Sequence, residues 1–300
     1  MKIGQLNTDE LIAVDFTMPE DSPITIETLS GNPSANFRVN VGCTKWGFKG
    51  WVGNLYPAKA KDKEFLTEYA KQFDAIELNT TFYQAPAQHV VDEWRERVSV
   101  NPDFRFCAKF PQKISHIRRC KNADEATDDF IKKMYSLGTH SGPSFLQMPE
   151  TFSIKFLTDL LPYLEGLPND LQTAIELRHR SWFESPEATF AAYSMIKETG
   201  TGTVISDTAT RRDFMHMILT TPHAFVRFMG YKVDSDYSRV DAWVERIARW
   251  KSLGLESVSF FIHTDNDSYA PLLADYVISK LTEKLNIPLK RPVFQNKDSV

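Results

Sequence analysis

The sequence has few cysteines and no long apolar segment near its start. Its three cysteines, Cys43, Cys107 and Cys120, are scattered and include no C-x-x-C pair. This arrangement excludes a disulfide framework and a cysteine-rich zinc site, and it is typical of a protein from the reducing cytoplasm. Because the first thirty residues contain no apolar run of sufficient length, we expect neither a signal peptide nor a membrane partner.

Charge of one sign is not in large excess either. The 35 lysines and arginines nearly balance the 39 aspartates and glutamates, giving a net charge of -4. No broad nucleic-acid-binding surface follows from this balance, although a local basic site is compatible with it. Residues 1–36 hold six acidic residues and one lysine. We interpret them as an acidic, loosely structured N-terminal extension, with a short docked strand at 24–28 as the alternative.

From residue 38 onward, short apolar runs alternate with longer segments of helical spacing. Eight runs have the length of a buried strand: 38–43, 74–79, 104–109, 143–147, 172–178, 202–206, 223–229 and 257–262. Between them apolar residues recur at helical intervals, as in Phe65, Tyr69 and Phe73. Eight strand–helix units in about 250 residues predict an α/β protein with a single (β/α)8 TIM-type barrel.

The main alternative is a doubly wound open sheet, which uses the same alternation. No G-x-G-x-x-G motif follows the first strand, so the sequence indicates no dinucleotide pocket, and no linker rich in Pro, Gly or Ser divides the chain. We therefore expect one barrel over 37–290, followed by a C-terminal tail over 291–300.

The alternation within each strand places polar side chains at the carboxyl ends, where barrel enzymes build their active sites. The candidates there are Glu77, Asn79, Lys109, Gln147, Glu176, Arg178, Asp207, Arg227 and His263, with Lys45 in the first loop. Their charges sum to about +1, which favours an anionic ligand such as a phosphate or carboxylate. The alternative is an internally neutralised network of ion pairs that only orders this end of the barrel.

Aromatic residues fall in the loops that follow the strands, among them Trp46, Tyr83 and Trp182. Such residues interleaved with arginine and lysine either stack on a base or sugar ring, or form an apolar plug in the loop layer. Both interpretations stay open.

Several spaced motifs resemble those of the YecE-like family, the domain of unknown function numbered seventy-two. The similar segments are GCTKWGFKGW (42–51) with LYP (55–57), ELNTTFY (77–83), FCAKFP (106–111) with ISH (114–116), LQMP (146–149) and ELRHRSWF (176–183). The resemblance implies a TIM-type barrel and no established reaction. Two segments depart from the family pattern: Arg227-Phe228-Met229-Gly230 replaces R-x-H-G, and 261–266 replaces an F-N-N-type segment.

Our leading hypothesis is an enzyme of hydrolase or lyase type acting on an anionic, phosphate-containing small molecule or a nucleic-acid fragment. Arg178, Arg227 and Lys109 would clamp the anion, and Glu77 or Glu176 would act as base. We expect catalytic roles for Glu77, Glu176, Lys109 and His179, and ligand binding by Lys45, Trp46, Asn79, Tyr83, Gln147, Arg178, Trp182, Asp207, Arg227 and His263.

Three alternatives to this hypothesis stay open. A divalent metal on Glu176 and His179 would suit a metal-dependent phosphodiesterase or sugar isomerase, but the sequence has only seven histidines, so we expect no cofactor. A Schiff base on Lys109 would need a lowered pKa, whereas a lysine held against Glu77 or Glu176 would keep an ordinary or raised pKa. A non-catalytic binding protein is the remaining alternative.

Overall fold

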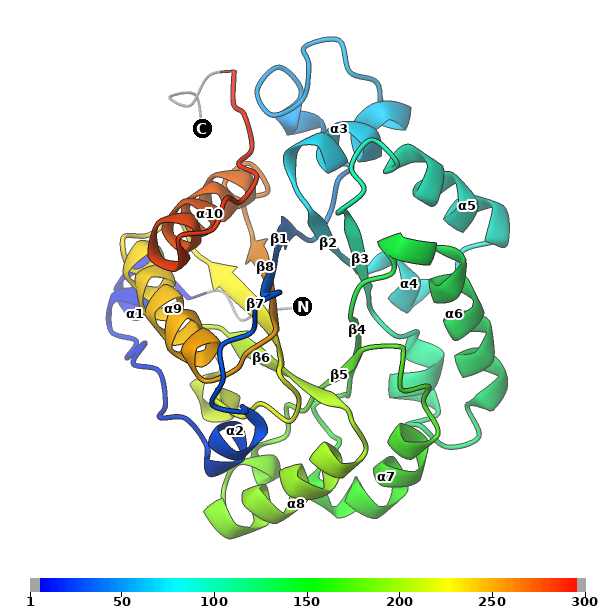
Figure 1. The fold of residues 1–300 in the computed structure, drawn as a ribbon, viewed down its shortest axis with the longest axis vertical. Coiled ribbons are helices and arrows are strands. Elements are labelled where there is room, and N and C mark those ends of the chain that lie inside the picture. Colours follow the sequence, from blue (N-terminus) through cyan, green and yellow to red (C-terminus); the bar gives the residue numbers. More distant parts are fainter. Residues whose placement is uncertain (1–5, 296–300) are drawn as a thin grey trace.

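The computed structural model describes residues 6–295, in which helices surround a curved parallel sheet (Figure 1). The strands are β1 Arg38–Cys43, β2 Ala75–Leu78, β3 Arg105–Ala108, β4 Ser144–Gln147, β5 Thr173–Glu176, β6 Gly202–Asp207, β7 His223–Gly230 and β8 Ser257–Thr264. The helices are α1 Thr8–Ile12, α2 Pro23–Thr28, α3 Phe65–Gln72, α4 Thr80–Tyr83, α5 Gln88–Arg97, α6 Asp124–Ser136, α7 Leu157–Glu165, α8 Pro186–Glu198, α9 Ser235–Ser252 and α10 Ala270–Leu285. The outer ends of the predicted extension and tail, residues 1–5 and 296–300, lie outside the described residues.

The α/β class is confirmed, but the prediction of a closed eight-stranded barrel is wrong. Six strands form one sheet in the order β1-β8-β7-β6-β5-β4, and β2 pairs only with β3. Between β3 and β4 there are two isolated bridges, Phe106 with Ser141 and Lys109 with Phe145, instead of a continuous ladder. The eight predicted strands are present, but the number of strand–helix units does not determine whether every neighbouring pair of strands forms hydrogen bonds.

A tyrosine side chain explains the break between β1 and β2. The Tyr69 hydroxyl accepts a hydrogen bond from Cys43 N (2.7 Å) and donates one to Ala75 O (3.0 Å). It therefore stands where a direct backbone hydrogen bond would close the sheet. At the same joint, a Cβ on Gly42 would lie 1.9 Å from Ala75 O, so only glycine allows the backbones to approach this closely.

The helices cover the outer face of the sheet through the stripes that the sequence predicts. In α3, Phe65 and Tyr69 are buried, with Phe73 at the C-cap, and in α9 the buried stripe includes Trp243 and Trp250. These side chains belong to the large core between strands and helices. Burial of such aromatic faces is worth about 1.5–3 kcal/mol per side chain, which makes this core the main source of stability.

A second, smaller core lies on the inner face of the sheet. It consists of Ala75, Cys107, Phe145, Ala174, Val204, Phe225 and Phe261. Seven strands contribute one residue each, and Gly42 of β1 lies in register with Phe261. Because side chains alternate between the two faces, the residues two positions further along each strand also face inward.

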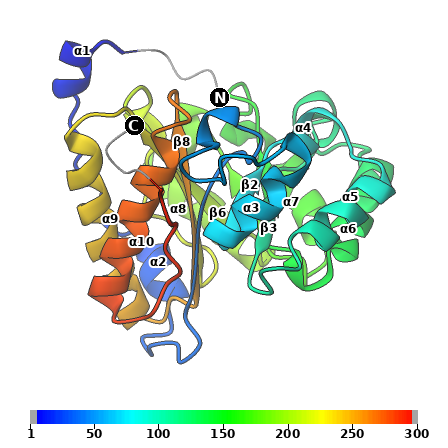
Figure 2. The ribbon, with the colours of Figure 1, turned by 90° about the horizontal axis from the view of Figure 1, so that it is seen from above.

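Residues 19–29, which precede β1, lie against α9 and against the segment between β6 and β7 (Figure 2). The buried Asp21 carboxylate pairs with Arg246 and accepts a hydrogen bond from Trp250 Nε1 (2.9 Å). Thr25 Oγ1 donates to Met217 O (2.7 Å). The predicted strand at 24–28 is a helix, α2, because Ser22 caps it and Pro23 occupies its first turn. The expectation of a loose structure is wrong from Asp21 to Leu29, whereas the domain boundary at residue 36 stays a prediction.

Among residues 6–295, no helix combines the length and the apolar character that crossing a membrane requires.

Candidate functional site at the carboxyl ends of the strands

A polar layer lies directly above the inner apolar core. It is formed by Glu77, Lys109, Gln147, Glu176, Ser206, Arg227 and His263, each two positions beyond a residue of that core. The inward orientation that the alternation predicts is thus confirmed for Glu77, Lys109 and Glu176. A charged layer at this position has no water beneath it, since the side chains below it are apolar. Its charges must therefore be balanced within the layer or by a ligand.

Arg227 lies at the centre of this layer and joins the two glutamates. Its Nε and Nη2 donate to the two carboxylate oxygens of Glu77, both at 2.9 Å. Its Nη1 donates to Glu176 (2.7 Å) and to Gln147 Oε1 (3.1 Å). The guanidinium also lies over the Phe145 ring, 5.0 Å from its centroid. Every side-chain nitrogen of Arg227 donates a hydrogen bond, and the side chain is only 3% exposed.

Both glutamates are buried and ionised. Burial alone would raise the pKa of Glu77, but the Arg227 guanidinium and His263 more than offset it and hold that pKa well below its usual range. Burial likewise acts upward on Glu176, yet Arg178, Arg227 and the Ser206 hydroxyl lower its pKa to about 2. Neither carboxylate is therefore suited to hold a proton near neutral pH.

Arg178 is the second guanidinium of the site and has a free edge. Its Nε and Nη2 donate to Glu176 Oε1 at 2.9 and 2.7 Å. Its Nη1 has no hydrogen-bond partner within residues 6–295. The side chain is 6% exposed, so this N–H group can reach a ligand arriving at the carboxyl ends. We call Glu77, Lys109, Gln147, Glu176, Arg178 and Arg227 the central cluster.

Lys109 is the one cation of the central cluster without a carboxylate partner in the described part of the chain. Its Nζ donates to Gln147 Oε1 (3.1 Å), the same oxygen that accepts from Arg227, and it lies 3.9 Å from the centroid of Phe82. Burial and the nearby Arg227 cation lower the pKa of Lys109 to about 7, although Glu176 and Glu77 act in the opposite direction. Lys109 forms no ion pair with either glutamate. The expectation that it lies against a glutamate and therefore keeps an ordinary or raised pKa is wrong.

Two further predicted residues extend the cluster at Glu77. Asn79 Nδ2 donates to Glu77 Oε1 (2.8 Å), and His263 Nε2 lies 2.9 Å from Glu77 Oε2. Burial lowers the pKa of His263 even though Glu77 raises it. The structure therefore brings together Glu77, Asn79, Lys109, Gln147, Glu176, Arg178, Arg227 and His263.

Asp207 does not join them. It follows the inward-facing Ser206 by one position and so points to the outer face, where its carboxylate pairs with Arg239 (3.0 Å) and Arg212 (2.6 Å) and accepts from Trp243 Nε1 (2.9 Å). Ser206 takes the inner place and donates to Glu176 Oε1 (2.6 Å). The expectation that Asp207 joins the site rests on its place at the end of the strand, whereas its position in the alternation assigns it to the outer face.

The predicted loop residues lie around the cluster or apart from it. Lys45 pairs with Asp267 (2.9 Å), and the partly buried Trp46 packs edge-on against Trp94 at 5.8 Å. Trp182 is fully buried and donates to Phe152 O (2.7 Å), so it belongs to the core and has no face for a ligand. Tyr83 is 71% exposed and is therefore the predicted aromatic residue with a free surface.

His179 lies in the loop after β5 beside Ser181. Its Nδ1 is 2.8 Å from Ser181 Oγ and accepts from Ser181 N (3.1 Å), so the ring caps the short helical turn Arg180–Trp182. Among the described residues, no hydrogen bond or ion pair joins the His179 side chain to the central cluster. This geometry fits a positioning residue of the loop better than a ligand for a metal ion.

His116 is a site residue that the sequence analysis did not select. Its ring packs edge-on against Phe82, with 5.0 Å between centroids, on the same phenyl ring that Lys109 contacts. Burial and the Lys109 and Arg178 cations lower the pKa of His116 to about 4, so the imidazole is neutral. It belongs to a π-helical turn, Lys113–Ile117. The ISH motif at 114–116 is the sequence signal that could have indicated this histidine.

The backbone just beyond this turn adopts an unusual conformation. Arg119, Cys120 and Asn122 have φ values of 49°, 67° and 49°, in the left-handed region that non-glycine residues rarely adopt. Such a conformation costs about 1–3 kcal/mol per residue and tends to occur near functional sites. It is found a few residues beyond His116, which contacts the same Phe82 ring as Lys109.

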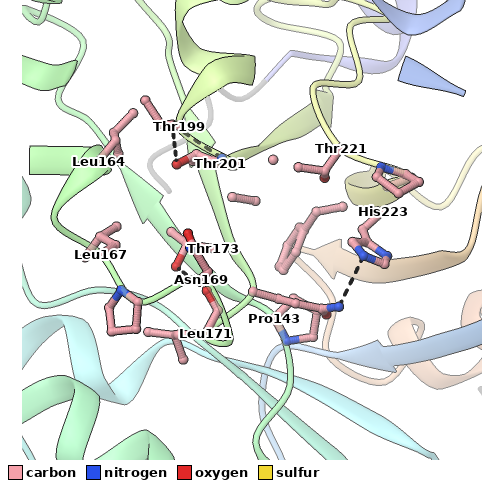
Figure 3. Close-up of a pocket in the computed structure, with 18 residues that line it drawn as sticks. Pro143, Leu164, Leu167, Asn169, Leu171, Thr173, Thr199, Thr201, Thr221 and His223 are labelled. Carbon is pink, nitrogen blue, oxygen red and sulfur yellow. Dashed lines mark hydrogen bonds between the residues drawn. The ribbon is translucent and has the colours of Figure 1, made fainter. Parts of the chain in front are cut away.

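A cavity of about 220 Å³ lies at the opposite, amino end of the strands (Figure 3). It is lined by the side chains of Thr199, Thr201 and Thr221, among others, and by His223, its only ionisable side chain. Thr199 Oγ1 donates to Ile196 O (2.7 Å) and Thr201 N (3.4 Å) donates to Thr199 Oγ1. The lining thus has much of its hydrogen-bonding capacity satisfied internally and few charged groups directed at a ligand, whereas the opposite end concentrates them.

Metal binding finds little support in the donor geometry. Within residues 6–295, no three His, Cys, Asp or Glu side chains are grouped so that they could hold a metal ion. The oxygens of Glu77 and Glu176 already accept hydrogen bonds from arginine, and a cation would have to compete with both guanidinium groups.

A curved parallel α/β sheet with buried charges at its carboxyl ends defines the class of this protein. A family model described as "Protein of unknown function DUF72" matches residues 40–297, and the chain belongs to this family. The UPF0759 protein YecE of Escherichia coli (strain K12) is 29% identical over 266 residues, covering 82% of this chain and 94% of YecE. The YecE-like resemblance is thus confirmed. The UPF0759 protein YunF of Bacillus subtilis (strain 168) is 27% identical over 158 residues, which is 49% of this chain and 53% of YunF.

Two solved structures share the fold. The DUF72 family protein TM1631 from Thermotoga maritima MSB8 superposes with a TM-score of 0.63 at 22% identity, covering 83% of this chain and all of that protein (100%). The DUF72 family protein EF0366 from Enterococcus faecalis V583 gives a TM-score of 0.65 at 19% identity, over 87% and 99% of the two chains. At these identities the likeness concerns the fold.

Proposed function

We propose that this chain is an enzyme that binds a small anionic compound, carrying a phosphate or carboxylate group, at the carboxyl ends of the strands. One observation carries the proposal: the central cluster contains two glutamates and two arginines that neutralise one another, and Lys109 is a third, surplus cation. A buried surplus charge costs several kcal/mol. An anionic ligand would offset this cost, and so would loss of the lysine proton.

The geometry changes the roles that the sequence suggested for the arginines. All three side-chain nitrogens of Arg227 already donate to Glu77, Glu176 or Gln147, so Arg227 orders the cluster and does not clamp a ligand. Arg178 keeps one free N–H edge and, with Lys109, forms the anion-binding pair of the proposal. A guanidinium edge is well matched to an oxyanion.

The proton-transfer group of the proposal is Lys109. Glu77 and Glu176 have lowered pKa values and occupied oxygens, which argues against either as general base. Lys109, with a pKa of about 7, exists in both protonation states at neutral pH. Of the two expected reaction types, a lyase fits better than a hydrolase, because the described residues near the cluster offer no carboxylate free to activate water.

The alternative of a non-catalytic binding protein is favoured by the number of internal ion pairs in the cluster, which could serve stability alone. The two proposals differ in what they expect of Lys109. A cluster that only stabilises the fold gains nothing from a surplus cation, whereas an anion site requires one.

Thermal unfolding with inorganic phosphate and pyrophosphate tests the anion site. An anion at a hundred times its dissociation constant should stabilise the protein by about 2.7 kcal/mol. Lys109→Met should abolish this stabilisation and Arg178→Gln should weaken it, whereas the exposed Lys132→Met, on α6, should leave it intact. Equal stabilisation of wild type and Lys109→Met, or none of wild type by either anion, would falsify the proposal.

A further inference from the structure

The surroundings of Lys109 favour a neutral, nucleophilic amine. Lys109 is 8% exposed, its Nζ lies against the face of Phe82, and it shares the single acceptor Gln147 Oε1 with Arg227. Since both nitrogens lie 3.1 Å from that oxygen, the lysine and guanidinium nitrogens are at most twice that distance apart. A neutral amine avoids the repulsion between these cations and keeps a lone pair for reaction.

We propose that Lys109 forms a Schiff base with an aldehyde or ketone that carries a phosphate or carboxylate group. This inference rests on the function proposed above and adds the carbonyl group to the substrate class. The Nζ lone pair attacks the carbonyl carbon while the C=O π electrons move to oxygen. Transfer of one N–H proton to that oxygen gives a carbinolamine. Uptake of one proton from solvent then releases water, leaving a protonated imine, so that amine, carbonyl compound and proton yield iminium ion and water.

The anionic group of the substrate has a definite role in this step. The iminium ion places a fixed positive charge where the neutral amine was, beside Arg227 and Arg178. A phosphate or carboxylate on the same molecule offsets that charge and can accept a hydrogen bond from the free Nη1 of Arg178. With a carbonyl compound that lacks such a group, the positive charge of the iminium ion would have no balancing anion. Such a compound should therefore react poorly.

The neutral His116 is the second group placed near the reacting nitrogen. It lies on the same Phe82 ring as Lys109, and its Nδ1 is 2.9 Å from Ser115 Oγ. Its Nε2 has no hydrogen-bond partner within residues 6–295. As a neutral imidazole it can take part in a hydrogen bond to the substrate without adding a third cation beside the iminium ion.

Reductive trapping tests this inference with two probes, pyridoxal 5′-phosphate and pyridoxal, which share the aldehyde and differ in the phosphate. The full-length protein is incubated with each at pH 7, reduced with borohydride and mapped by peptide mass spectrometry. We expect Lys109 to be labelled at least about tenfold faster than the exposed Lys132, and pyridoxal to label Lys109 much more slowly than its phosphate ester. The labelling rate at Lys109 should reach half its maximum near pH 7.

Two variants separate the possible failures. Arg178→Gln should slow labelling by pyridoxal 5′-phosphate more than labelling by pyridoxal, while Lys109→Arg keeps the charge and loses the label. Uniform labelling of surface lysines with Lys109 unmodified would overturn the Schiff base. If phosphate and pyrophosphate still stabilised the protein in that case, the proposed anion site would be retained and only the imine would be contradicted. If neither labelling of Lys109 nor stabilisation by the anions were observed, both proposals would be wrong.

Discussion

Two buried arginines have similar surroundings, but the net charge of the groups around them differs. Arg227, on the inner face of the sheet, lies between Glu77 and Glu176, and Arg239, on the outer face, lies between Asp207 and Asp236. Each guanidinium is 3% exposed and lies over a phenylalanine ring, at 5.0 Å for Arg227 and 4.1 Å for Arg239. We call Asp207, Arg212, Asp236 and Arg239 the outer network.

The outer network is neutral and tied to the backbone. Its two arginines match its two aspartates, and Asp236 Oδ2 accepts from the backbone N–H groups of Tyr231 and Lys232, both at 2.8 Å. It fixes the loop after β7 to α9. The central cluster also contains two arginines and two carboxylates, but it has Lys109 in addition. Comparison of the two therefore separates charge pairing that only stabilises the fold from charge pairing that also leaves a cation available.

Replacing Arg227 or Arg239 should give the largest effects. Arg227→Met leaves Glu77 without an arginine and Arg239→Met leaves Asp236 without one, while Glu176 keeps Arg178 and Asp207 keeps Arg212; each change should cost about 3–5 kcal/mol of unfolding free energy in urea denaturation. The two positions should differ once Lys109 is changed as well. Lys109→Met alone should stabilise the unliganded protein by about 1–4 kcal/mol, because it removes the surplus buried cation.

In the Arg227→Met background the same change should destabilise the protein, since Arg178 stays paired with Glu176 and Lys109 is then the cation of the central cluster that can balance Glu77. In the Arg239→Met background Lys109→Met should remain stabilising, as in wild type, because the outer network does not contact it. A double-mutant cycle measures this reversal of sign. Equal effects of Lys109→Met in both backgrounds would contradict the assignment of Lys109 as surplus charge of the central cluster.

The pH dependence of stability sharpens the same comparison. Folding lowers the pKa of Lys109 from 10.5 to about 7, so between these pH values the unfolded chain binds more protons and wild-type stability rises with pH. The cost of the buried ammonium is fully present below about pH 7 and is lost as the pH approaches 10.5. Lys109→Met lacks this group, so its advantage over wild type should shrink above pH 7 by at most about 1.4 kcal/mol per pH unit.

Denaturation at several pH values checks this expectation, with Lys132→Met as control. The control should follow wild type in parallel, because Lys132 is exposed on α6. A difference between wild type and Lys109→Met that stays constant from pH 7 to pH 10 would show that the lysine keeps its ordinary pKa.

Much of the central cluster could be predicted from the sequence, because strand alternation is a local property. Polar residues between apolar ones, as in Ile76-Glu77-Leu78 and Ile175-Glu176-Leu177, must face away from the helices. The same rule, applied to the sixth strand, selects Ser206 and rejects Asp207. The error there came from judging Asp207 by its position at the strand end.

Contacts between distant parts of the chain could not be predicted in this way. The Tyr69 hydroxyl that separates β1 from β2 belongs to a helix whose pattern shows only an apolar face. The burial of Trp182 depends on Phe152, thirty positions earlier, which stacks on its ring and accepts its N–H group. Similarly, no local pattern shows that Lys109 shares Gln147 with Arg227 and has no carboxylate of its own.

A matched pair of hydroxyl deletions should give the smallest effects and compares the two sites most directly. Ser206→Ala removes the hydrogen bond to Glu176 (2.6 Å), and Tyr269→Phe removes the one to Asp236 (3.2 Å). Each acceptor is a buried carboxylate that keeps its arginine, so each loss should cost about 1–2 kcal/mol of unfolding free energy. Loss of the serine also raises the pKa of Glu176, which stays ionised at pH 7 because its pKa starts from about 2.

The two deletions should separate when inorganic phosphate is added. Tyr269→Phe should keep the full stabilisation by the anion, since Asp236 lies on the outer face of the sheet, away from Lys109 and Arg178. In Ser206→Ala, Glu176 loses one of its donors, so Arg178 should be held more firmly against that carboxylate. Its stabilisation by phosphate should therefore fall by a small but measurable amount. The same response in both variants would mean that the phosphate does not bind at the central cluster.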